Sequence, residues 1–200
     1  MAVEDSGSRR GARAKCAPTV TSAADGSRAS GAVPHEPGKW SIENIEIGIP
    51  QLVEDALRIN AEELLRHGVT IQREFEAVPP VRADQHKVLQ ILVNLLRNAD
   101  DALNAAAPGE RILSLRICRN GDDRVRILVR DTGIGIASEN LIRLFGHGFT
   151  TKRDGHGFGL HSGAVAAKEM GGALRAASEG LGRGATFTLD KSAAWPMKPS

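Results

Sequence analysis

The longest helical pattern in the chain covers residues 85–105 and carries one broad apolar face. The apolar residues of this face are Val88, Leu89, Ile91, Leu92, Leu95, Leu96, Ala99, Ala102 and Leu103. Asp84 stands directly before the pattern, where a carboxylate can accept hydrogen bonds from the first free N–H groups of a helix. A helix with so wide an apolar face must be covered by other elements, so a layered fold is expected.

Shorter elements on both sides of this helix can supply the second layer. Further helices are expected over 51–66 and 159–170. Segments that alternate apolar and polar residues, or are rich in Val and Ile, predict strands over 45–47, 69–75, 111–118, 124–130, 173–178 and 185–190. Helices and hairpins mixed in this way predict an α+β fold, a two-layer α/β sandwich in which about three helices cover one face of a mixed sheet.

Composition sets the limits of this domain and excludes some functions. Residues 1–39 contain almost no large apolar side chains and are expected to be a disordered tail, followed by one domain over 40–190 and a second tail over 191–200. The net charge of +2 gives no argument for nucleic acid. No apolar run approaches the ~18 residues that span a bilayer, and the N-terminus lacks a signal-peptide core, so a cytoplasmic location is expected.

Two asparagines interrupt the apolar surroundings of the long helix in the sequence NLLRNADDAL. Asn94 and Asn98 lie one turn apart, so their amides share one helical face. Amides in apolar surroundings need polar partners, because burying them without hydrogen bonds costs free energy. They can bond to nearby backbone, or they can offer oxygen ligands to Mg²⁺, which takes few protein ligands and keeps several waters.

The sequence RDTGIGI at 130–136 follows a strand rich in Val and Ile. Asp131 at the end of this strand can form a turn, which is a common role for aspartate. It can also accept a hydrogen bond from an exocyclic amine, while Gly133 and Gly135 allow a flat ring to approach the backbone. The two interpretations stay open on these residues alone.

Two glycine-rich segments follow. LFGHGFTTK at 144–152 places Phe145 and Phe149 around two glycines, with Thr150, Thr151 and Lys152 behind them, so it can anchor a loop or cover a triphosphate. The next segment, GHGFGLHSGAVAAKEMGG at 155–172, leads into a helix, whose free N-terminal N–H groups suit a phosphate. An ordinary flexible loop before a helix is the alternative.

In this order, NLLRNADDA, DTGIGI, LFGHGFTTK and GHGFGLH resemble the N box, the first glycine box, the F box and the second glycine box of sensor histidine kinases. GRGATFTL at 182–189 resembles the strand that closes their ATP-binding domain. The resemblance covers residues 41–190 and implies the Bergerat ATP-binding fold of gyrases, heat-shock chaperones, histidine kinases and mismatch-repair ATPases. The segment from GFTTK to GHGFGLH looks closest to nitrogen-regulation-type kinases.

The resemblance implies that ATP and Mg²⁺ are the cofactors. Asp131 would bind the adenine amino group, with Gly133 and Gly135 leaving space for the ring and Thr186 completing the pocket. Asn98 would be the Mg²⁺ ligand and a catalytic residue, with Asn94 beside it. Gly155, Gly157 and Gly159 would close the ATP lid and lead into the helix that faces the phosphates, and Lys152 would be the catalytic cation on the γ-phosphate. Thr151 and Leu160 are further expected nucleotide-binding residues.

The function implied is transfer of the γ-phosphate to a histidine on a sensor-kinase dimerisation domain, with a response regulator as the indirect partner in a two-component system. We expect that dimerisation domain to be absent from this chain, because only a few residues separate His35 from the first strand and none of them is helical in pattern. A hydrolytic ATPase is disfavoured, since Asn94 stands where such relatives have a glutamate base. A nucleotide-binding regulatory module, for example an anti-sigma-like protein, is the alternative.

Three further histidines, His147, His156 and His161, lie in or next to the glycine-rich segments. No cysteine and no pattern of residues that would support metal ligands accompanies them in the sequence, so a metal site built on these side chains is not expected.

Overall fold

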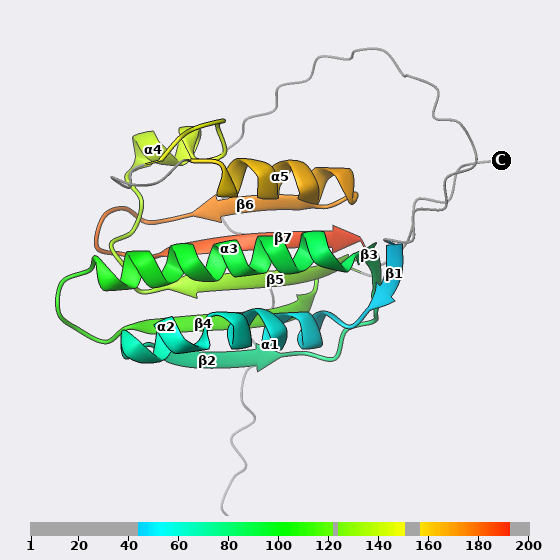
Figure 1. The fold of residues 1–200 in the computed structure, drawn as a ribbon. Helices are drawn as coiled ribbons and strands as arrows, with labels where there is room; N and C mark the ends of the chain where they lie inside the picture. The colour runs from blue at the N-terminus through cyan, green and yellow to red at the C-terminus, as the bar shows by residue number, and fades with distance from the viewer. Residues whose placement is uncertain (1–43, 122–123, 151–156, 193–200) are drawn as a thin grey trace, which may run out of the picture. The chain divides into compact units, whose positions relative to one another are not determined.

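The structure is a computed structural model that describes residues 44–121, 124–150 and 157–192 (Figure 1). In chain order, its elements are β1 (Asn44–Ile47), α1 (Ile49–Ile59), α2 (Ala61–Arg66), β2 (Thr70–Phe75), β3 (Val81–Asp84), α3 (Gln85–Asn104), β4 (Ile112–Arg119), β5 (Arg124–Asp131), α4 (Ser138–Arg143), α5 (Gly159–Glu169), β6 (Ala173–Ala177) and β7 (Ala185–Ser192). None of the helices in the described ranges is long and apolar enough to cross a membrane.

Five strands form one mixed sheet in the order β2-β4-β5-β7-β6. The β2–β4 pair is parallel, whereas β4–β5, β5–β7 and β6–β7 are antiparallel. Strands β1 and β3 pair with each other in a separate two-stranded sheet. The prediction of a mixed sheet is confirmed.

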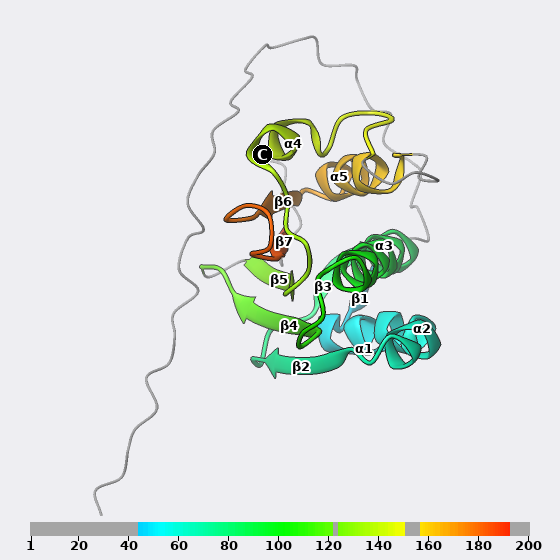
Figure 2. The ribbon, with the colours of Figure 1, turned by 90° about the vertical axis from the view of Figure 1, so that its left-hand side faces the viewer.

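Helices α1, α3 and α5 lie on one side of the five-stranded sheet, with α3 between the other two (Figures 1 and 2). Alternate residues of the central strands point toward these helices and are buried, for example Leu115 of β4, Ile127 of β5 and Leu189 of β7. They form one hydrophobic core with the apolar residues of the helices. The two-layer sandwich with three covering helices is therefore confirmed.

Helix α3 begins and ends nearly where its pattern predicts. The Asp84 carboxylate caps it by accepting hydrogen bonds from the backbone N–H groups of His86 at 2.9 Å and Lys87 at 3.1 Å. The buried residues of the helix are Val88, Ile91, Leu92, Leu95, Leu96, Ala99, Asp100 and Leu103. The one charged member, Asp100, accepts a hydrogen bond from Nδ1 of His67, which lies 2.9 Å from either carboxylate oxygen.

The helix predicted over 51–66 is two helices, because the chain turns at Asn60. The side-chain amide of Asn60 donates to the carbonyl of Ala56 at 2.8 Å, and the Asn60 backbone N–H bonds to the same carbonyl and to that of Leu57. Asparagine competes in this way with the regular helix pattern. Helix α1 consequently ends at Ile59 and α2 begins at Ala61.

Two elements were not predicted. Strand β3 is short and follows two prolines, and its pairing partner β1 lies far earlier in the chain. Helix α4 buries none of its residues, so it has no apolar periodicity by which to recognise it. Strand β7 also extends to Ser192, two residues into the predicted C-terminal tail. The rest of that tail and residues 1–39 lie outside the described residues.

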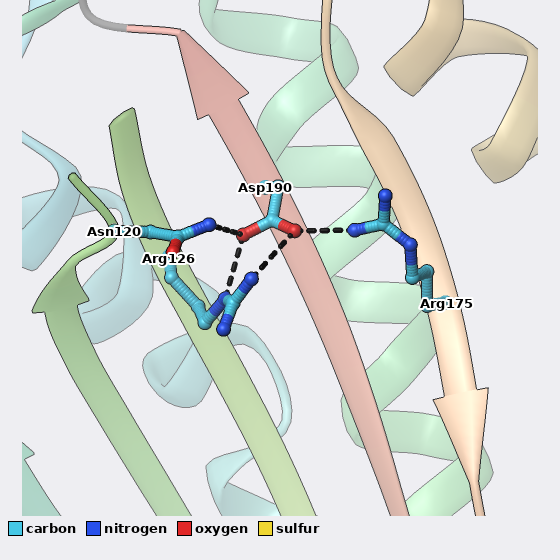
Figure 3. A network of polar contacts seen from close by, with 4 residues as sticks. All are labelled: Asn120, Arg126, Arg175 and Asp190. Carbon is cyan, nitrogen blue, oxygen red and sulfur yellow. Dashed lines mark hydrogen bonds and ion pairs between the residues drawn. The ribbon is translucent and has the colours of Figure 1, made fainter. Parts of the chain in front are cut away.

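The sheet face away from the helices carries a polar network centred on Asp190 of β7 (Figure 3). Arg126 of β5 donates to both Asp190 oxygens, at 2.7 and 3.1 Å, and Arg175 of β6 donates to one of them at 2.5 Å. Asn120 adds a longer hydrogen bond of 3.3 Å. Burial alone would raise the pKa of Asp190, but the hydrogen bonds and charges of the two arginines lower it below its ordinary value.

We predict that Asp190→Asn destabilises the domain by roughly 1.5–3 kcal/mol at pH 7, the cost typical of losing a hydrogen-bonded charge. Because the folded-state pKa of Asp190 is lowered, its contribution is complete above the unfolded value of about 3.9 and is lost as the pH falls through the folded value. Urea unfolding at pH 7 and in acid measures both effects. Glu62→Gln on the exposed surface of α2 is the control, and equal unfolding midpoints for Asp190→Asn and the wild type would contradict the prediction.

Candidate functional site

Asp131 is the last residue of β5 and is only 2% exposed. The strand alternation that buries Ile127 and Val129 also points Asp131 toward the helical layer. One carboxylate oxygen accepts a hydrogen bond of 2.8 Å from the N–H of Gly133. Burial raises the pKa of Asp131 above its ordinary value, while the backbone hydrogen bonds from Gly133 and Ala185 act in the opposite direction. The site therefore holds a buried carboxylate bonded to backbone groups.

The two glycines after Asp131 are required by close backbone contacts. A Cβ at Gly133 would lie 2.5 Å from the carbonyl carbon of Ala102 in α3, and the next residue, Ile134, donates its N–H to that carbonyl group. Gly135 has φ +71°, and a Cβ there would lie 2.1 Å from the carbonyl oxygen of Gly180. The loop after β5 is thus packed between α3 and the loop that joins β6 to β7.

The β6–β7 loop adds Ser178, a residue of the site that no recognised motif includes. The Ser178 hydroxyl accepts from the N–H of Ile136 at 3.0 Å and donates to the carbonyl of Gly184 at 2.7 Å. Gly184 has φ +67°, and a Cβ there would lie 2.0 Å from the carbonyl oxygen of Asp131. The glycines of the GLGRG turn were the signal that could have located this loop.

The expected place of Thr186 needs a correction. In the β5–β7 register, Thr186 pairs with Arg130, and Ala185 pairs with Asp131. Because neighbouring residues of a strand point to opposite faces, Thr186 lies on the face away from the helices and Asp131 on the face toward them. The structure does not bring Thr186 to Asp131, and Ala185 takes the position across from the carboxylate.

Asn94 and Gly159 meet between α3 and α5. A Cβ at Gly159 would lie 2.3 Å from the Oδ1 atom of Asn94, so α5 begins directly against this amide. Asn94 and Gly159 line a groove between the two helices together with Lys87 and Arg97. Asn98 is partly exposed one turn further along α3, and Leu160 packs against the core.

The segment after α4 returns to the beginning of α5. Gly148 and Gly157 both have positive φ, at +73° and +70°, and a Cβ at Gly157 would lie 2.4 Å from the carbonyl carbon of Gly148. The backbone at Gly148 is therefore in contact with the backbone at Gly157. Three of the predicted site residues, Thr151, Lys152 and Gly155, lie outside the described residues.

The described side chains suit a cation that needs few protein ligands. Residues 44–121, 124–150 and 157–192 contain no group of three or more His, Cys, Asp or Glu side chains that could hold a metal ion. The amide oxygen of Asn98 is a hard ligand of the kind that Mg²⁺ accepts, and Mg²⁺ commonly completes its shell with waters and substrate phosphates. These residues fit a Mg²⁺ ion that arrives with a nucleotide.

Comparison with known proteins gives consistent matches. Residues 83–193 match the family described as histidine kinase-, DNA gyrase B-, and HSP90-like ATPase. The chain is 37% identical over 144 residues to sensor histidine kinase ZraS of Salmonella typhimurium, a match that covers 66% of this chain and 30% of ZraS. It is 31% identical over 151 residues to sensor protein TdiS of Thauera aromatica, which covers 74% of this chain and 27% of TdiS. The chain thus spans less than a third of the length of these relatives.

Solved structures show the same fold. One is the crystal structure of full-length ShkA in complex with AMPPNP. The alignment covers 78% of this chain and 33% of the ShkA chain, with a TM-score of 0.66 and 28% identity. Another is the catalytic domain of histidine kinase ThkA. The alignment covers 76% of this chain and 99% of the ThkA domain, with a TM-score of 0.67 and 22% identity. The family match includes α3, the loop after Asp131 and the start of α5, which are the elements of the site described above. The chain therefore belongs to the histidine kinase-, DNA gyrase B- and HSP90-like ATPase family.

Proposed function

We propose that this domain binds Mg-ATP and donates the γ-phosphate to a histidine on the dimerisation domain of a two-component sensor kinase. The observation that carries the proposal is the arrangement on the helical side of the sheet: a buried carboxylate at the end of β5, and an asparagine of α3 against the first residue of α5. The kinship with sensor histidine kinases supports the transfer of phosphate to histidine.

The adenine ring would bind at Asp131. An ionised carboxylate held by two backbone N–H groups is a strong acceptor for an exocyclic amine, and burial strengthens such a hydrogen bond. Gly133, Gly135 and Gly184 let the backbone of Ala102, Gly180 and Asp131 pack closely around this end of β5, and Ala185 adds only a methyl group across from the carboxylate. The AMPPNP in the structure of the relative ShkA supports a nucleotide as the ligand.

The phosphates would bind at the other end, where α5 begins. Its N-cap residue Phe158 makes no side-chain cap hydrogen bond, and the first turn of α5 contains no acidic residue. Free N–H groups and a partial positive charge at a helix N-terminus favour an anion. In this proposal, Asn98 ligates the Mg²⁺ ion, Asn94 lies beside it, and Thr151, Lys152 and Gly155 belong to a segment that covers the triphosphate.

The residue at position 94 favours transfer to a protein acceptor over transfer to water. Asn94 has a neutral amide, which cannot take a proton from a water molecule. Phosphoryl transfer depends chiefly on positioning and charge neutralisation, and Mg²⁺ supplies part of that neutralisation at the phosphates. The domain's own residues would therefore hold the nucleotide while the acceptor histidine is brought into line by another domain.

We predict that Asp131→Asn lowers the affinity for a non-hydrolysable ATP analogue by roughly ten- to a hundredfold, since a charge-assisted hydrogen bond contributes about 1.5–3 kcal/mol. Titration calorimetry measures the change, with Glu62→Gln as the control for loss of one carboxylate. Equal affinity in the variant and the wild type would exclude Asp131 from the adenine site.

The same contact makes binding sensitive to pH. Burial raises the pKa of Asp131 in the free domain, and the adenine amine bonds to the ionised form, so affinity is full above this pKa and falls as the pH drops through it. Asp131→Asn cannot titrate, so its affinity for ADP should change less between pH 7 and acid than that of the wild type. Parallel pH profiles for the two proteins would count against the assignment.

A second prediction separates the metal ligand from the rest of the site. Asn98→Ala should weaken nucleotide binding in Mg²⁺ but change it little in EDTA, because its amide oxygen is assigned to the metal. Asn104→Ala, at the exposed end of the same helix, is the control. If Asn98→Ala loses the same affinity with and without Mg²⁺, the residue contacts the nucleotide or supports the fold instead.

A third prediction tests the transfer itself. Mixed at high concentration with the dimerisation domain of a related sensor kinase and labelled ATP, the chain should transfer label slowly to the acceptor histidine, because the acceptor is not tethered. Asp131→Asn and Asn98→Ala should both abolish the labelling. Acceptor domains that stay unlabelled while ATP binds normally would favour a nucleotide-binding regulatory module without kinase activity of its own.

A further inference from the structure

We infer that His161 is a positioning residue that fixes the FGHGF turn (residues 145–149) against the first turn of α5. Helix α5 starts where the proposed phosphate end of the nucleotide site lies, so His161 would hold this turn in place for a triphosphate. Only the identity of that ligand rests on the proposed function. The contact between the turn and α5 can be tested without any nucleotide.

A hydrogen bond joins the two segments directly. Nδ1 of His161 lies 2.9 Å from the carbonyl oxygen of Phe145, and His161 is partly buried. A carbonyl oxygen can only accept, so Nδ1 must carry the proton and donate it.

Ring contacts support the same attachment. The His147 ring of the turn lies 5.2 Å from the His161 ring, centroid to centroid, at an interplanar angle of 86°. It also lies 5.1 Å from the ring of Phe158, the residue before α5, at 59°. The His147–His161 pair is edge-to-face, a geometry that is favourable for aromatic rings, and the His147–Phe158 pair is tilted. His147 therefore contacts both ends of the junction that leads into α5.

Apolar and backbone contacts also hold the turn, since Phe145 packs against the core and the backbone of Gly148 meets that of Gly157. Of its five residues, Phe145 and Phe149 are partly buried, whereas Gly146, His147 and Gly148 are exposed. The guanidinium of Arg143 lies over the Phe149 ring at 5.0 Å, which attaches the turn to α4. Helix α4 itself buries none of its residues. The hydrogen bond from His161 is a polar contact that links the turn to α5, which packs on α3 and the sheet.

The position of α5 explains why this attachment matters for the site. Gly159, its first residue, contacts the Asn94 amide of α3, and His161 follows two residues later. Figures 1 and 2 show α4 and the chain after it beside this end of α5. A turn fixed to His161 is consequently fixed relative to Asn94, and less directly to Asp131 at the end of β5. Loss of the attachment should affect the phosphates more than the adenine.

The experiment compares four variants of the full chain without nucleotide, by amide hydrogen exchange. His161→Ala removes the donor, His161→Asn returns an N–H at the position of Nδ1, and His161→Gln places its amide one carbon further along. His86→Ala on the exposed start of α3 is the control. We expect exchange of the amides of residues 146–149 to rise in His161→Ala and His161→Gln, and to stay near the wild-type rate in His161→Asn and His86→Ala. Exchange that is unchanged in His161→Ala, or raised equally over the sheet, overturns the inference.

Binding then tests the consequence for the site. His161→Ala should bind a non-hydrolysable ATP analogue about tenfold more weakly, the equivalent of one net hydrogen bond, and bind AMP as the wild type does. His161→Asn should restore most of the loss. An equal loss for both nucleotides, or no rescue by His161→Asn, overturns the positioning role. A wild-type chain that binds no nucleotide refutes the proposed function, and hydrogen exchange alone then decides the attachment.

Discussion

The packing of α3 on the sheet is the contact on which both the core and the site depend. The helix lies between α1 and α5, and its apolar face covers the buried side of β4, β5 and β7. The same helix carries Asn94 and Asn98, and its carbonyl at Ala102 binds the loop that follows Asp131. Its position on the sheet thus fixes the separation between the carboxylate at the end of β5 and the asparagine against α5. Burial of apolar surface is not directional, but because it fixes α3 on the sheet it also sets the distance between the polar groups of the site.

Two buried aspartates on opposite faces of the sheet have different hydrogen-bond donors and pKa shifts in opposite directions. Asp190, on the face away from the helices, has two arginines around it, and its pKa is lowered. Asp131, on the helical side, has backbone N–H groups as hydrogen-bond donors, and its pKa is raised by burial. The first aspartate contributes to folding stability in the ionised form. The second is costly to ionise in the free domain, and such groups are common at sites that bind or react.

Much of the fold followed from periodicity, and the failures have identifiable causes. Helix α3 and the central strands were predicted because their apolar residues repeat at the right spacing over many residues. Asn60 divided a predicted helix through a side-chain hydrogen bond that the apolar pattern does not record. Strand β3 is defined by pairing with β1, and pairing partners distant in sequence cannot be read from local pattern. Helix α4 has no buried face to reveal it.

The site was predicted less completely than the fold, for a related reason. Asp131, Gly133 and Gly135 were recognised from their order in a motif, and the structure gives the two glycines close backbone contacts. Thr186 was expected in the adenine pocket, but it pairs with Arg130, and a shift of one residue in a strand reverses the direction of a side chain. Gly184 belongs to the recognised segment GRGATFTL, whereas Ser178 acts through its hydroxyl from outside every recognised motif.

The contact between Asn94 and Gly159 also bears on how such a domain can change over evolution. Three atoms of the Asn94 amide lie 2.3–2.8 Å from the place where a Cβ at Gly159 would stand. A glutamate at position 94 would bring one more methylene into this space, and any side chain at 159 would displace the amide. Substitutions at the two positions are therefore coupled, because a larger residue at 159 requires the Asn94 side chain to move and a longer side chain at 94 requires room beside the start of α5.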